Sequence, residues 1–386
     1  MRREVLAVAA WRRFDRGVVL FHEGEAGGSL YVLMRGQVAI RVTTLDGDTA
    51  TLNVIGPGAA FGELSLLDPA TTRTATVQAI EPVQTLVLQR ADFERLRRTP
   101  RLMGHALAMR AYFCGTRGST PVNGAEHLHY GGHTSCIGLA HAGEPPTVGL
   151  DAGTGLQRLW LVLGGQAFRG TLLLSHLHWD HTHGMPFFRS GALPGSRVDV
   201  YLPEQGVEPE ELLARAISPP HFPIRPKQLG DGWTFNALEP GHYEFEGFSV
   251  DALEIPHKGG RTFGYRVSDG SGTLAYLPDH SPISLGPGPD GTGVIHEAAI
   301  TLTEGADLLV HDSQHTAAEL PRLGFLGHSA IEYAVALAQR ANARQFALFH
   351  HDPWRTDAEI DALVAQHAAA PVRVFAAHDG MVMDLP

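Results

Sequence analysis

Lysine is almost missing from this chain, which contains only Lys227 and Lys258 among its 386 residues. Cysteine is equally scarce, and Cys114 and Cys136 alone cannot build a disulfide framework. Long apolar runs are missing too, and the one near the start (residues 5–11) is too short for a signal peptide or a membrane helix. These absences predict a cytoplasmic protein that does not bind membranes.

The distribution of charge narrows the choice of partner. Residues 1–110 carry 14 Arg and 11 Asp or Glu, whereas residues 111–386 carry 16 basic and 30 acidic residues, a net charge of −14. A long nucleic acid needs a basic track that binds its phosphates, so the larger part of the chain favours a small substrate. A length of 386 residues, 44% of them hydrophobic, suits two domains with separate cores.

The most informative segment is residues 176–181, which read His-Leu-His-Trp-Asp-His after the apolar run 171–175. A buried strand that ends in a polar cluster delivers its side chains to the edge of a sheet. His176 and His178 can point to the same side of an extended chain. Asp180 and His181 follow after a bend and can face a second metal. Imidazole and carboxylate are ligand types that zinc prefers, so the segment predicts a metal site.

Histidine and aspartate recur where other short apolar runs end, and 20 of the 22 histidines lie beyond residue 111. The candidates are His257 after residues 248–255, Asp279 and His280 after 273–277, His311 and Asp312 after 307–310, and His350, His351 and Asp352 after 346–349. Ends of successive strands can meet at one rim of a sheet, where α/β folds build their sites. Not all of these residues can be ligands. Seven other histidines follow no such run and are expected to be structural or solvent-facing: His127, His129, His133, His141, His221, His296 and His367.

On these motifs, residues 111–386 resemble the metallo-β-lactamase superfamily, whose fold is an α/β sandwich of αββα layers. Within it they resemble the branch of ribonuclease Z and related phosphodiesterases. Residues 115–121 and 149–155 are similar to the glycine turn and the Asp-x-Gly element of that branch. The resemblance implies two Zn²⁺ ions, with Mn²⁺ as the alternative. It implies that His176, His178 and His257 hold one metal, that Asp180, His181 and His350 hold the other, and that Asp279 bridges them.

His328 resembles the histidine that donates a proton in this branch, and Asp180 would act as a metal ligand rather than as a free base. Two metals about 3.5–4 Å apart can lower the pKa of a water towards ~7 and clamp both oxygens of a phosphoryl transfer. Residues 329–332 read Ser-Ala-Ile-Glu, a capping box that predicts a helix to about Gln339. A residue just outside a helix cap is held in place, which suits proton donation, although the positive end of the helix opposes the imidazolium form.

The first 110 residues show a different pattern of short β-runs separated by turns. The runs lie at residues 18–21, 30–33, 38–42, 75–80 and 85–88, with a hairpin tip at 46–48. Many short strands at regular spacing predict an all-β jelly roll or barrel, here with flanking helices.

Residues 61–77 resemble the phosphate-binding cassette of cyclic-nucleotide-binding domains, the family of the catabolite activator protein and of kinase regulatory subunits. The resemblance implies that a short helix from about Glu63 offers N–H groups to a phosphate. It also implies that Arg73 neutralises that phosphate, that Glu63 accepts the ribose hydroxyl and that Thr74 adds a hydroxyl contact. The residues of this predicted nucleotide site are Gly62, Glu63, Leu64, Ser65, Arg73 and Thr74.

We therefore expect a cyclic-nucleotide-binding domain at residues 1–110, in which residues 91–110 form relay helices, and a metallohydrolase domain at residues 111–386. Transcription factors of the first family carry a helix-turn-helix where this chain carries the hydrolase, so a DNA-binding output is not expected. The implied ligand is a small cyclic nucleotide, cAMP or cGMP. Members of both families often form dimers, which favours a homodimer.

The fusion favours a metal-dependent phosphodiesterase that opens a 3′,5′-cyclic nucleotide under allosteric control by the first domain, an inference by association. Three alternatives stay open. One is another metallohydrolase activity, on RNA, a different phosphodiester or a lactone. The second is a non-catalytic cyclic-nucleotide receptor. The third is a di-iron redox protein of the same fold, in which a carboxylate commonly replaces the residue equivalent to His178.

Overall fold

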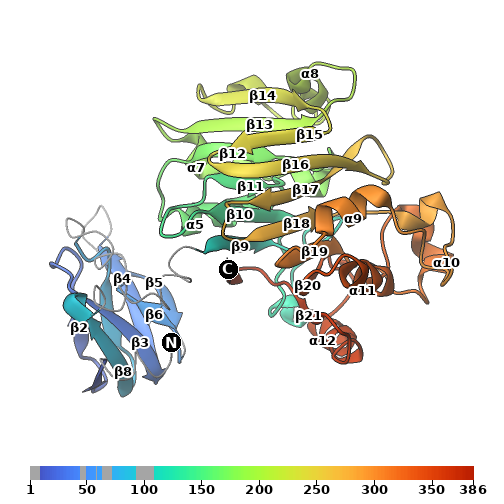
Figure 1. Cartoon of the computed structure of the whole chain (residues 1–386). Helices are drawn as coiled ribbons and strands as arrows, with labels where there is room; N and C mark the ends of the chain where they lie inside the picture. Colours follow the sequence, from blue (N-terminus) through green and yellow to red (C-terminus); the bar gives the residue numbers. More distant parts are fainter. Residues whose placement is uncertain (1–8, 44–48, 58, 63–71, 93–107) are drawn as a thin grey trace. The chain divides into compact units, whose positions relative to one another are not determined.

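The computed structural model describes residues 9–43, 49–57, 59–62, 72–92 and 108–386. The chain divides into two compact units, Met1–Ala106 and Leu107–Pro386, each with its own core (Figure 1).

The N-terminal unit is built from two four-stranded sheets whose neighbouring strands are all antiparallel. The first sheet has the order β1 (Ala10–Phe14), β8 (Val83–Gln89), β3 (Ser29–Arg35) and β6 (Ala60–Phe61). The second has the order β2 (Val19–Phe21), β7 (Thr76–Ala79), β4 (Val38–Thr43) and β5 (Thr49–Ile55). This arrangement confirms the predicted all-β class. The predicted hairpin tip at 46–48 lies outside the described residues, between the paired Thr43 and Thr49.

Aromatic rings fill the centre of this unit. Phe21, Tyr31 and Phe61 come from both sheets, and the rings of Tyr31 and Phe61 stack with centroids 5.3 Å apart. The relay helices predicted at residues 91–110 fall largely on residues that the structure does not describe.

The C-terminal unit contains two seven-stranded mixed sheets (Figure 1). The first has the order β14 (Trp233–Leu238), β13 (Arg197–Pro203), β12 (Arg169–Leu173), β11 (Val148–Leu150), β10 (Cys136–Ala140), β9 (Met109–Gly115) and β22 (Val382–Leu385). The second has the order β15 (Gly241–Phe245), β16 (Phe248–Ile255), β17 (Thr262–Ser268), β18 (Thr273–Leu277), β19 (Leu308–Asp312), β20 (Gln345–Phe349) and β21 (Arg373–Ala376).

Helices complete the outer layers, which confirms the αββα architecture. They are α5 (Leu156–Val162), α6 (Trp179–Thr182), α7 (Arg189–Ala192), α8 (Pro209–Ala214), α9 (Glu297–Thr303), α10 (Leu320–Leu323), α11 (Ile331–Arg340) and α12 (Asp357–Gln366). Short 3₁₀ turns lie at Ala125–His127, Met185–Phe187, Pro226–Gln228, Pro282–Leu285 and Gly324–Leu326. None of the described helices is long and apolar enough to cross a lipid bilayer.

The central strands are apolar on both faces because both faces are covered. In β18, Leu274 and Tyr276 point into the core between the two sheets, whereas Ala275 and Leu277 point into the core beneath α9 and α11. This alternation follows from the two-residue period of a strand, and it explains why such strands read as continuous apolar runs in the sequence. Strands held on both faces are rigid supports for the residues that follow them.

The predicted helix over residues 331–339 is confirmed as α11, but its predicted capping box is wrong. Ala330 is the N-cap, and the Ser329 hydroxyl donates to the Ala330 carbonyl instead of accepting from the helix. The Ser329 backbone N–H donates to Asp312 at 3.1 Å, and Glu332 accepts from the Ala317 N–H. The competing bonds to Asp312 and Ala317 therefore replace the reciprocal cap.

Candidate metal centre

Strands that run in the same direction deliver the candidate ligands to one edge of the sandwich. β16, β18, β19 and β20 share a direction in the second sheet, since β16 and β18 are both antiparallel to β17 and the later pairs are parallel. β11 and β12 are parallel in the first sheet. The residues just beyond these carboxyl ends are Asp151, His176, His257, Asp279, Ser313 and His350. The strand ends bring residues far apart in sequence to one place.

Three histidines form the first group of candidate ligands. His178 Nδ1 lies 3.3 Å from His257 Nε2, and the rings of His176 and His178 are 4.4 Å apart. One oxygen of Asp279, Oδ2, lies 3.5 Å from His176 Nε2 and 3.3 Å from His257 Nε2. The four ligand atoms all lie within 4.8 Å of one another, as a shared ion requires.

The second group faces the other oxygen of Asp279. Asp279 Oδ1 lies 3.1 Å from both His181 Nε2 and His350 Nε2. Asp180 Oδ2 lies 3.0 Å from His350 Nε2 and accepts the Ser119 N–H at 2.6 Å. The carboxylate of Asp279 therefore stands between the two groups with one oxygen towards each.

The donor atoms fit divalent metals. The buried His176 Nε2 and both oxygens of Asp279 have no hydrogen-bond partner among the described residues. Leaving such atoms without partners in a protein interior is costly, and a cation on each side of Asp279 would satisfy all three. Nitrogen and carboxylate oxygen in sets of three or four are what zinc binds.

The pKa values of His176 and Asp180 favour the protonation states that bind a cation. Burial and the neighbouring His181 hold the pKa of His176 well below its ordinary value, so its ring is neutral and Nε2 keeps a lone pair. Burial alone would raise the pKa of Asp180, but His181 and His350 outweigh it and hold that pKa well below the ordinary value. Neutral imidazole and ionised carboxylate are the forms in which His176 and Asp180 bind a metal. Burial lowers the pKa of His181, but Asp180, Asp279 and Asp151 outweigh burial and raise that pKa well above its ordinary value, so a metal would have to displace its proton.

Asp151 orients the second group although it is not itself a candidate ligand. Its fully buried carboxylate accepts the Ser175 N–H at 2.7 Å, the Ser175 hydroxyl at 2.8 Å and the Tyr276 hydroxyl at 2.8 Å. His181 Nδ1 lies 2.7 Å from the same carboxylate and therefore donates, which leaves His181 Nε2 free to face Asp279. A carboxylate behind a histidine fixes the ring and its tautomer in many metal sites.

Backbone geometry at the strand ends is unusual and supports a functional site. Asp151 (φ 60°) and His350 (φ 58°) adopt the left-handed conformation that non-glycine residues seldom take. Gly118 packs directly on His350, since an added Cβ would lie 2.4 Å from His350 Nδ1. Only glycine fits there without moving the histidine.

His328 lies beside the second group. Its Nδ1 is 3.1 Å from Asp312 and 3.8 Å from Asp279, and its ring stacks on His350 with centroids 4.9 Å apart. Burial lowers the pKa of His328, but Asp312, Asp279 and Asp180 outweigh burial and raise the pKa to about 9.

The remaining strand-end histidines do not face the centre. His280 Nδ1 lies 2.9 Å from His311 Nε2, behind the site, and His351 bonds the Ala377 carbonyl. The supporting roles of Ser175 and Asp312 were not predicted from the sequence. A role for Asp312 could be predicted from its position at the end of a strand. Ser175 directly precedes the first ligand, and no sequence pattern marks it.

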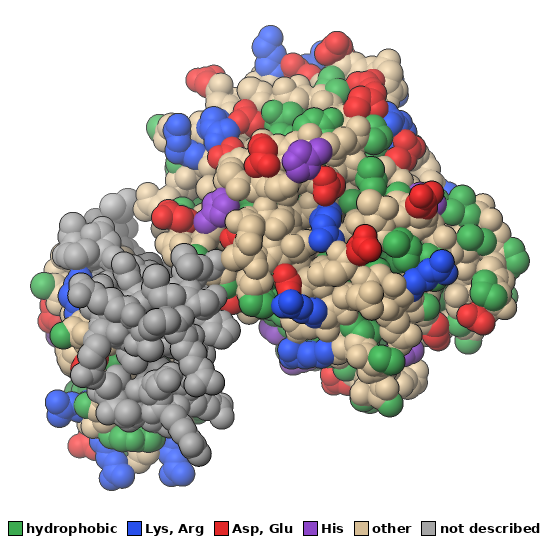
Figure 2. All heavy atoms as spheres, viewed as in Figure 1, with side chains coloured by type: hydrophobic (Ala, Val, Ile, Leu, Met, Phe, Trp, Pro, Cys, Tyr) green, Lys and Arg blue, Asp and Glu red, His purple; other side chains and the backbone are tan. Residues whose placement is uncertain are grey.

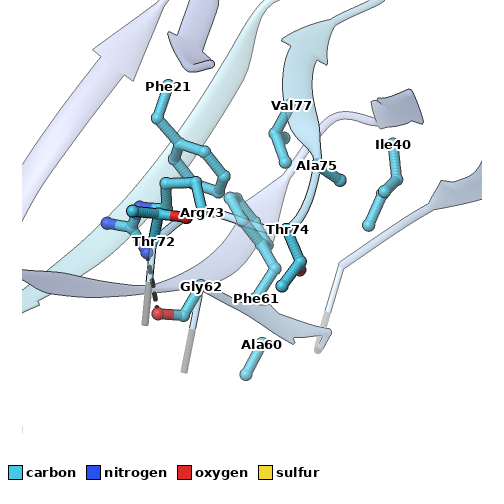
Figure 3. Close-up of a pocket in the computed structure, with 10 residues that line it drawn as sticks. All are labelled: Phe21, Ile40, Ala60, Phe61, Gly62, Thr72, Arg73, Thr74, Ala75 and Val77. Carbon is cyan, nitrogen blue, oxygen red and sulfur yellow. Dashed lines mark hydrogen bonds between the residues drawn. The ribbon is translucent and has the colours of Figure 1, made fainter. Parts of the chain in front are cut away.

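In the N-terminal unit, Arg73 is buried (5% exposed) and lies over the Phe21 ring at 4.1 Å (Figure 3). It donates to the Gly62 carbonyl at 2.8 Å and to the Ser29 carbonyl at 2.9 Å. Gly62 has a φ of 81°, and an added Cβ would lie 2.5 Å from Arg73 Nη1. A cavity of about 160 Å³ opens here, and its lining residues are Phe21, Ile40, Ala60, Phe61, Gly62, Thr72, Arg73, Thr74, Ala75 and Val77.

Three residues of the predicted nucleotide site, Gly62, Arg73 and Thr74, line this cavity. Glu63, Leu64 and Ser65 lie outside the described residues.

Residues 11–99 match the family model of the cyclic nucleotide-binding domain, and residues 170–351 match that of the beta-lactamase superfamily domain. The chain joins a cyclic nucleotide-binding domain to a metallo-β-lactamase-fold domain. The domain match and the similarity to ribonuclease Z described below indicate a metal-dependent hydrolase.

Relatives agree with this division. Ribonuclease Z of Natronomonas pharaonis is 25% identical over 321 aligned residues, 72% of this chain and 99% of the relative. The cyclic AMP receptor protein of Thermus thermophilus is 39% identical over 97 residues, 25% of this chain and 44% of the relative. The chain thus spans less than half of the second relative. The crystal structure of the metallo-β-lactamase fold protein YhfI from Bacillus subtilis has a TM-score of 0.54 at 18% identity, covering 72% of this chain and 99% of YhfI, which supports the fold.

The role of Asp151 can be tested by Asp151→Asn. The variant replaces one acceptor oxygen by an NH₂ group that faces donors, so His181 loses its orientation. We expect metal affinity, measured by competition with a chelator, to fall about 10- to 100-fold. Tyr276→Phe, which removes one donor and keeps the carboxylate, should lose less. An Asp151→Asn variant that is folded and binds metal as the parent does would contradict this role.

Proposed function

We propose that the C-terminal unit is a dinuclear phosphodiesterase that opens a 3′,5′-cyclic nucleotide, and that a cyclic nucleotide bound by the N-terminal unit regulates it. The observation that carries the proposal is Asp279, whose two oxygens each face one group of candidate ligands. In this proposal His176, His178 and His257 hold one metal, Asp180, His181 and His350 hold the other, and Asp279 bridges them. Zinc fits the ligand types, and manganese is the alternative.

Two divalent metals held by these residues would supply Lewis-acid stabilisation of phosphoryl oxygens and would activate water at neutral pH. The residues of the chain supply the rest. Asp151 and Ser119 hold His181 and Asp180 in position through their hydrogen bonds. Asp180 takes part in catalysis as a ligand, because a carboxylate with so low a pKa is a poor base at neutral pH.

His328 is the proton donor in this proposal. Opening the ring expels a ribose alkoxide, which is a poor leaving group unless it is protonated. Asp312 orients the ring through Nδ1, and its carboxylate raises the pKa of His328, which favours the protonated imidazole. His328, the proton donor, therefore lies next to the two groups of candidate ligands.

The charge of the unit supports a small substrate. On the face that Figure 2 shows, the Lys and Arg side chains of the described residues are scattered among Asp and Glu and form no continuous band. Arg261 and Arg355 are already paired, with Glu254 at 3.0 Å and Glu319 at 2.8 Å. Such a surface offers little to the successive phosphates of a long nucleic acid.

The N-terminal cavity supports a nucleotide as the regulatory ligand. Its walls combine apolar side chains with one buried guanidinium, a combination that suits a base and a phosphate in one molecule. The similarity to a cyclic AMP receptor protein favours cAMP.

RNA cleavage is the second candidate, because the similarity to ribonuclease Z extends over 99% of that enzyme. One experiment separates the two. Metal-loaded protein is incubated with a panel of 3′,5′-cyclic nucleotides and with a transfer RNA precursor, beside an Asp180→Ala/His181→Ala control. Conversion of a cyclic nucleotide to a linear monophosphate that the control lacks supports our proposal. Cleavage of the precursor alone would replace it by a ribonuclease.

The role of His328 predicts a dependence on the leaving group. His328→Gln should retain both metals and lose about 10²- to 10⁴-fold in kcat on a cyclic nucleotide. It should lose far less on bis(p-nitrophenyl) phosphate, whose leaving group needs no proton. Metal analysis is run on the same samples. Equal losses on the two substrates would show that His328 is not the proton donor.

The regulatory role predicts that Arg73→Ala abolishes the response of the activity to added cyclic nucleotide and leaves the metal content intact. Ser29→Ala is the matched control, because it removes the hydroxyl that Arg73 bonds at 3.0 Å but keeps the charge. We expect calorimetry to show a tight nucleotide site in the control that is missing in Arg73→Ala, whereas binding to the C-terminal unit is the same in both. An unchanged response in Arg73→Ala would exclude this cavity as the regulatory site.

A further inference from the structure

Two large exposed side chains and one lysine lie next to the candidate ligands in the sequence, and neither the fold nor the ligand set accounts for them. Trp179 stands between His178 and Asp180, and Lys258 follows His257. Phe325 lies three residues before His328, within about 11 Å along the chain. Trp179 is 66% exposed and Phe325 is 67% exposed, so their rings contribute little to the core.

Trp179 forms a flat platform at the edge of the centre. It begins α6, and its ring stacks on His183 with centroids 5.5 Å apart and an interplanar angle of 18°. Consecutive residues of a helix point in directions about 100° apart, so Trp179 and the neighbouring candidate ligand Asp180 point in different directions. The stack on His183 holds one face of the indole, and its high exposure leaves contact area for another ring.

Lys258 and Phe325 form a second part of the edge. The ammonium of Lys258 lies 5.9 Å from the centre of the Phe325 ring and donates to the Phe325 carbonyl. The two loops are locked together, since His257 Nδ1 donates to the Gly327 carbonyl at 2.8 Å. Among the described residues no carboxylate pairs with Lys258, so its charge is available to an anion.

We propose that Trp179, Phe325 and Lys258 form a recognition rim for the nucleoside part of the substrate: the nucleobase stacks on an aromatic ring while Lys258 attracts the phosphate. The proposal rests on the proposed function, because it names the group attached to the phosphodiester. Aromatic side chains accept any base through its π face, and an ammonium in an acidic unit marks where an anion approaches. Neither a lipid chain nor a peptide requires this pairing of flat rings with a single cation.

The aromatic part is tested by calorimetry on the full, metal-loaded chain with two probes, AMP and ribose 5-phosphate, which differ in the base. Trp179→Ala and Phe325→Ala should weaken AMP binding about 5- to 100-fold, the range that loss of one base stack gives, and leave ribose 5-phosphate unchanged. Leu161→Ala removes a side chain that is equally exposed (68%) on α5 and serves as the control. Trp179→Phe should recover most of the affinity.

Two results would contradict the aromatic part of the proposal. In the first, the aromatic variants weaken the binding of AMP and of ribose 5-phosphate equally. In the second, neither Trp179→Ala nor Phe325→Ala weakens the binding of either probe. Metal analysis of each variant shows whether the centre is intact, and Phe325→Ala decides the matter if Trp179→Ala loses metal. AMP bound by the N-terminal unit would not respond to these substitutions, so the difference between variants reports on the rim alone. In a third outcome, the protein fails to hydrolyse cyclic nucleotides while the aromatic variants still weaken the binding of AMP and not that of ribose 5-phosphate. That result would support the recognition rim and contradict the proposed reaction.

Lys258 is tested against the only other lysine of the chain. Lys258→Gln should weaken AMP and ribose 5-phosphate alike, and the difference from the parent should shrink as salt is raised. Lys227→Gln carries the same charge change, beside β14, and should leave both probes unchanged. Equal effects of the two substitutions would mean that Lys258 acts only through the net charge.

Discussion

The position of the Asp279 carboxylate between two clusters of imidazoles is the constraint on which the rest of the site depends. An ionised, buried carboxylate is expensive unless cations or donors surround it. Burial opposes its charge, yet His350, His181 and His176 outweigh burial and hold its pKa well below the ordinary value. The histidine nitrogens, in turn, come within 3.3 Å of one another in each group. A cation between the nitrogens of each group would bind their lone pairs, so metal binding and the arrangement of the donor set would stabilise each other.

The fold holds these groups at fixed distances through its strands. The ligands follow strands that pack into the cores, and β12, β18 and β20 are buried on both faces over most of their length, so the strand ends are held by the cores. The left-handed residues Asp151 and His350 directly follow β11 and β20. Packing that is strong enough to hold these conformations also fixes the donor atoms, which is why the residues that support the ligands matter as much as the ligands themselves.

How much of this the sequence reveals depends on how local each contact is. His176, His178, Asp180 and His181 lie in one short segment, and their chemistry can be predicted from spacing alone. The strand-end rule finds His257, Asp279 and His350 as candidates, but it cannot choose between His350 and His351. That choice depends on the turn at φ 58°, which points His350 into the centre and leaves His351 bonded to Ala377.

Hydrogen-bond partners that lie far apart in the sequence are even harder to predict. The capping box at Ser329 satisfies every local rule and fails because Asp312, 17 residues earlier, takes the Ser329 N–H. In the N-terminal unit, the cassette identifies Arg73 from the sequence, but its bond to the Ser29 carbonyl spans 44 residues and has no signature. Sequence patterns predict elements and local ligands, whereas hydrogen bonds across the fold decide which side chain reaches the site.

Charge decides how large a substrate this centre can take. The electrostatic cost of approaching an acidic surface grows with each phosphate that must come close, and it is offset only where basic side chains replace the counterions. A polynucleotide brings many phosphates along the surface, far from the centre, where the unit offers mixed charge. In our proposal a cyclic nucleotide brings one phosphate, which would approach the candidate ligands and Lys258. The negative charge of this unit would then oppose a long RNA more than a small phosphodiester, because few lysines are present to replace the counterions.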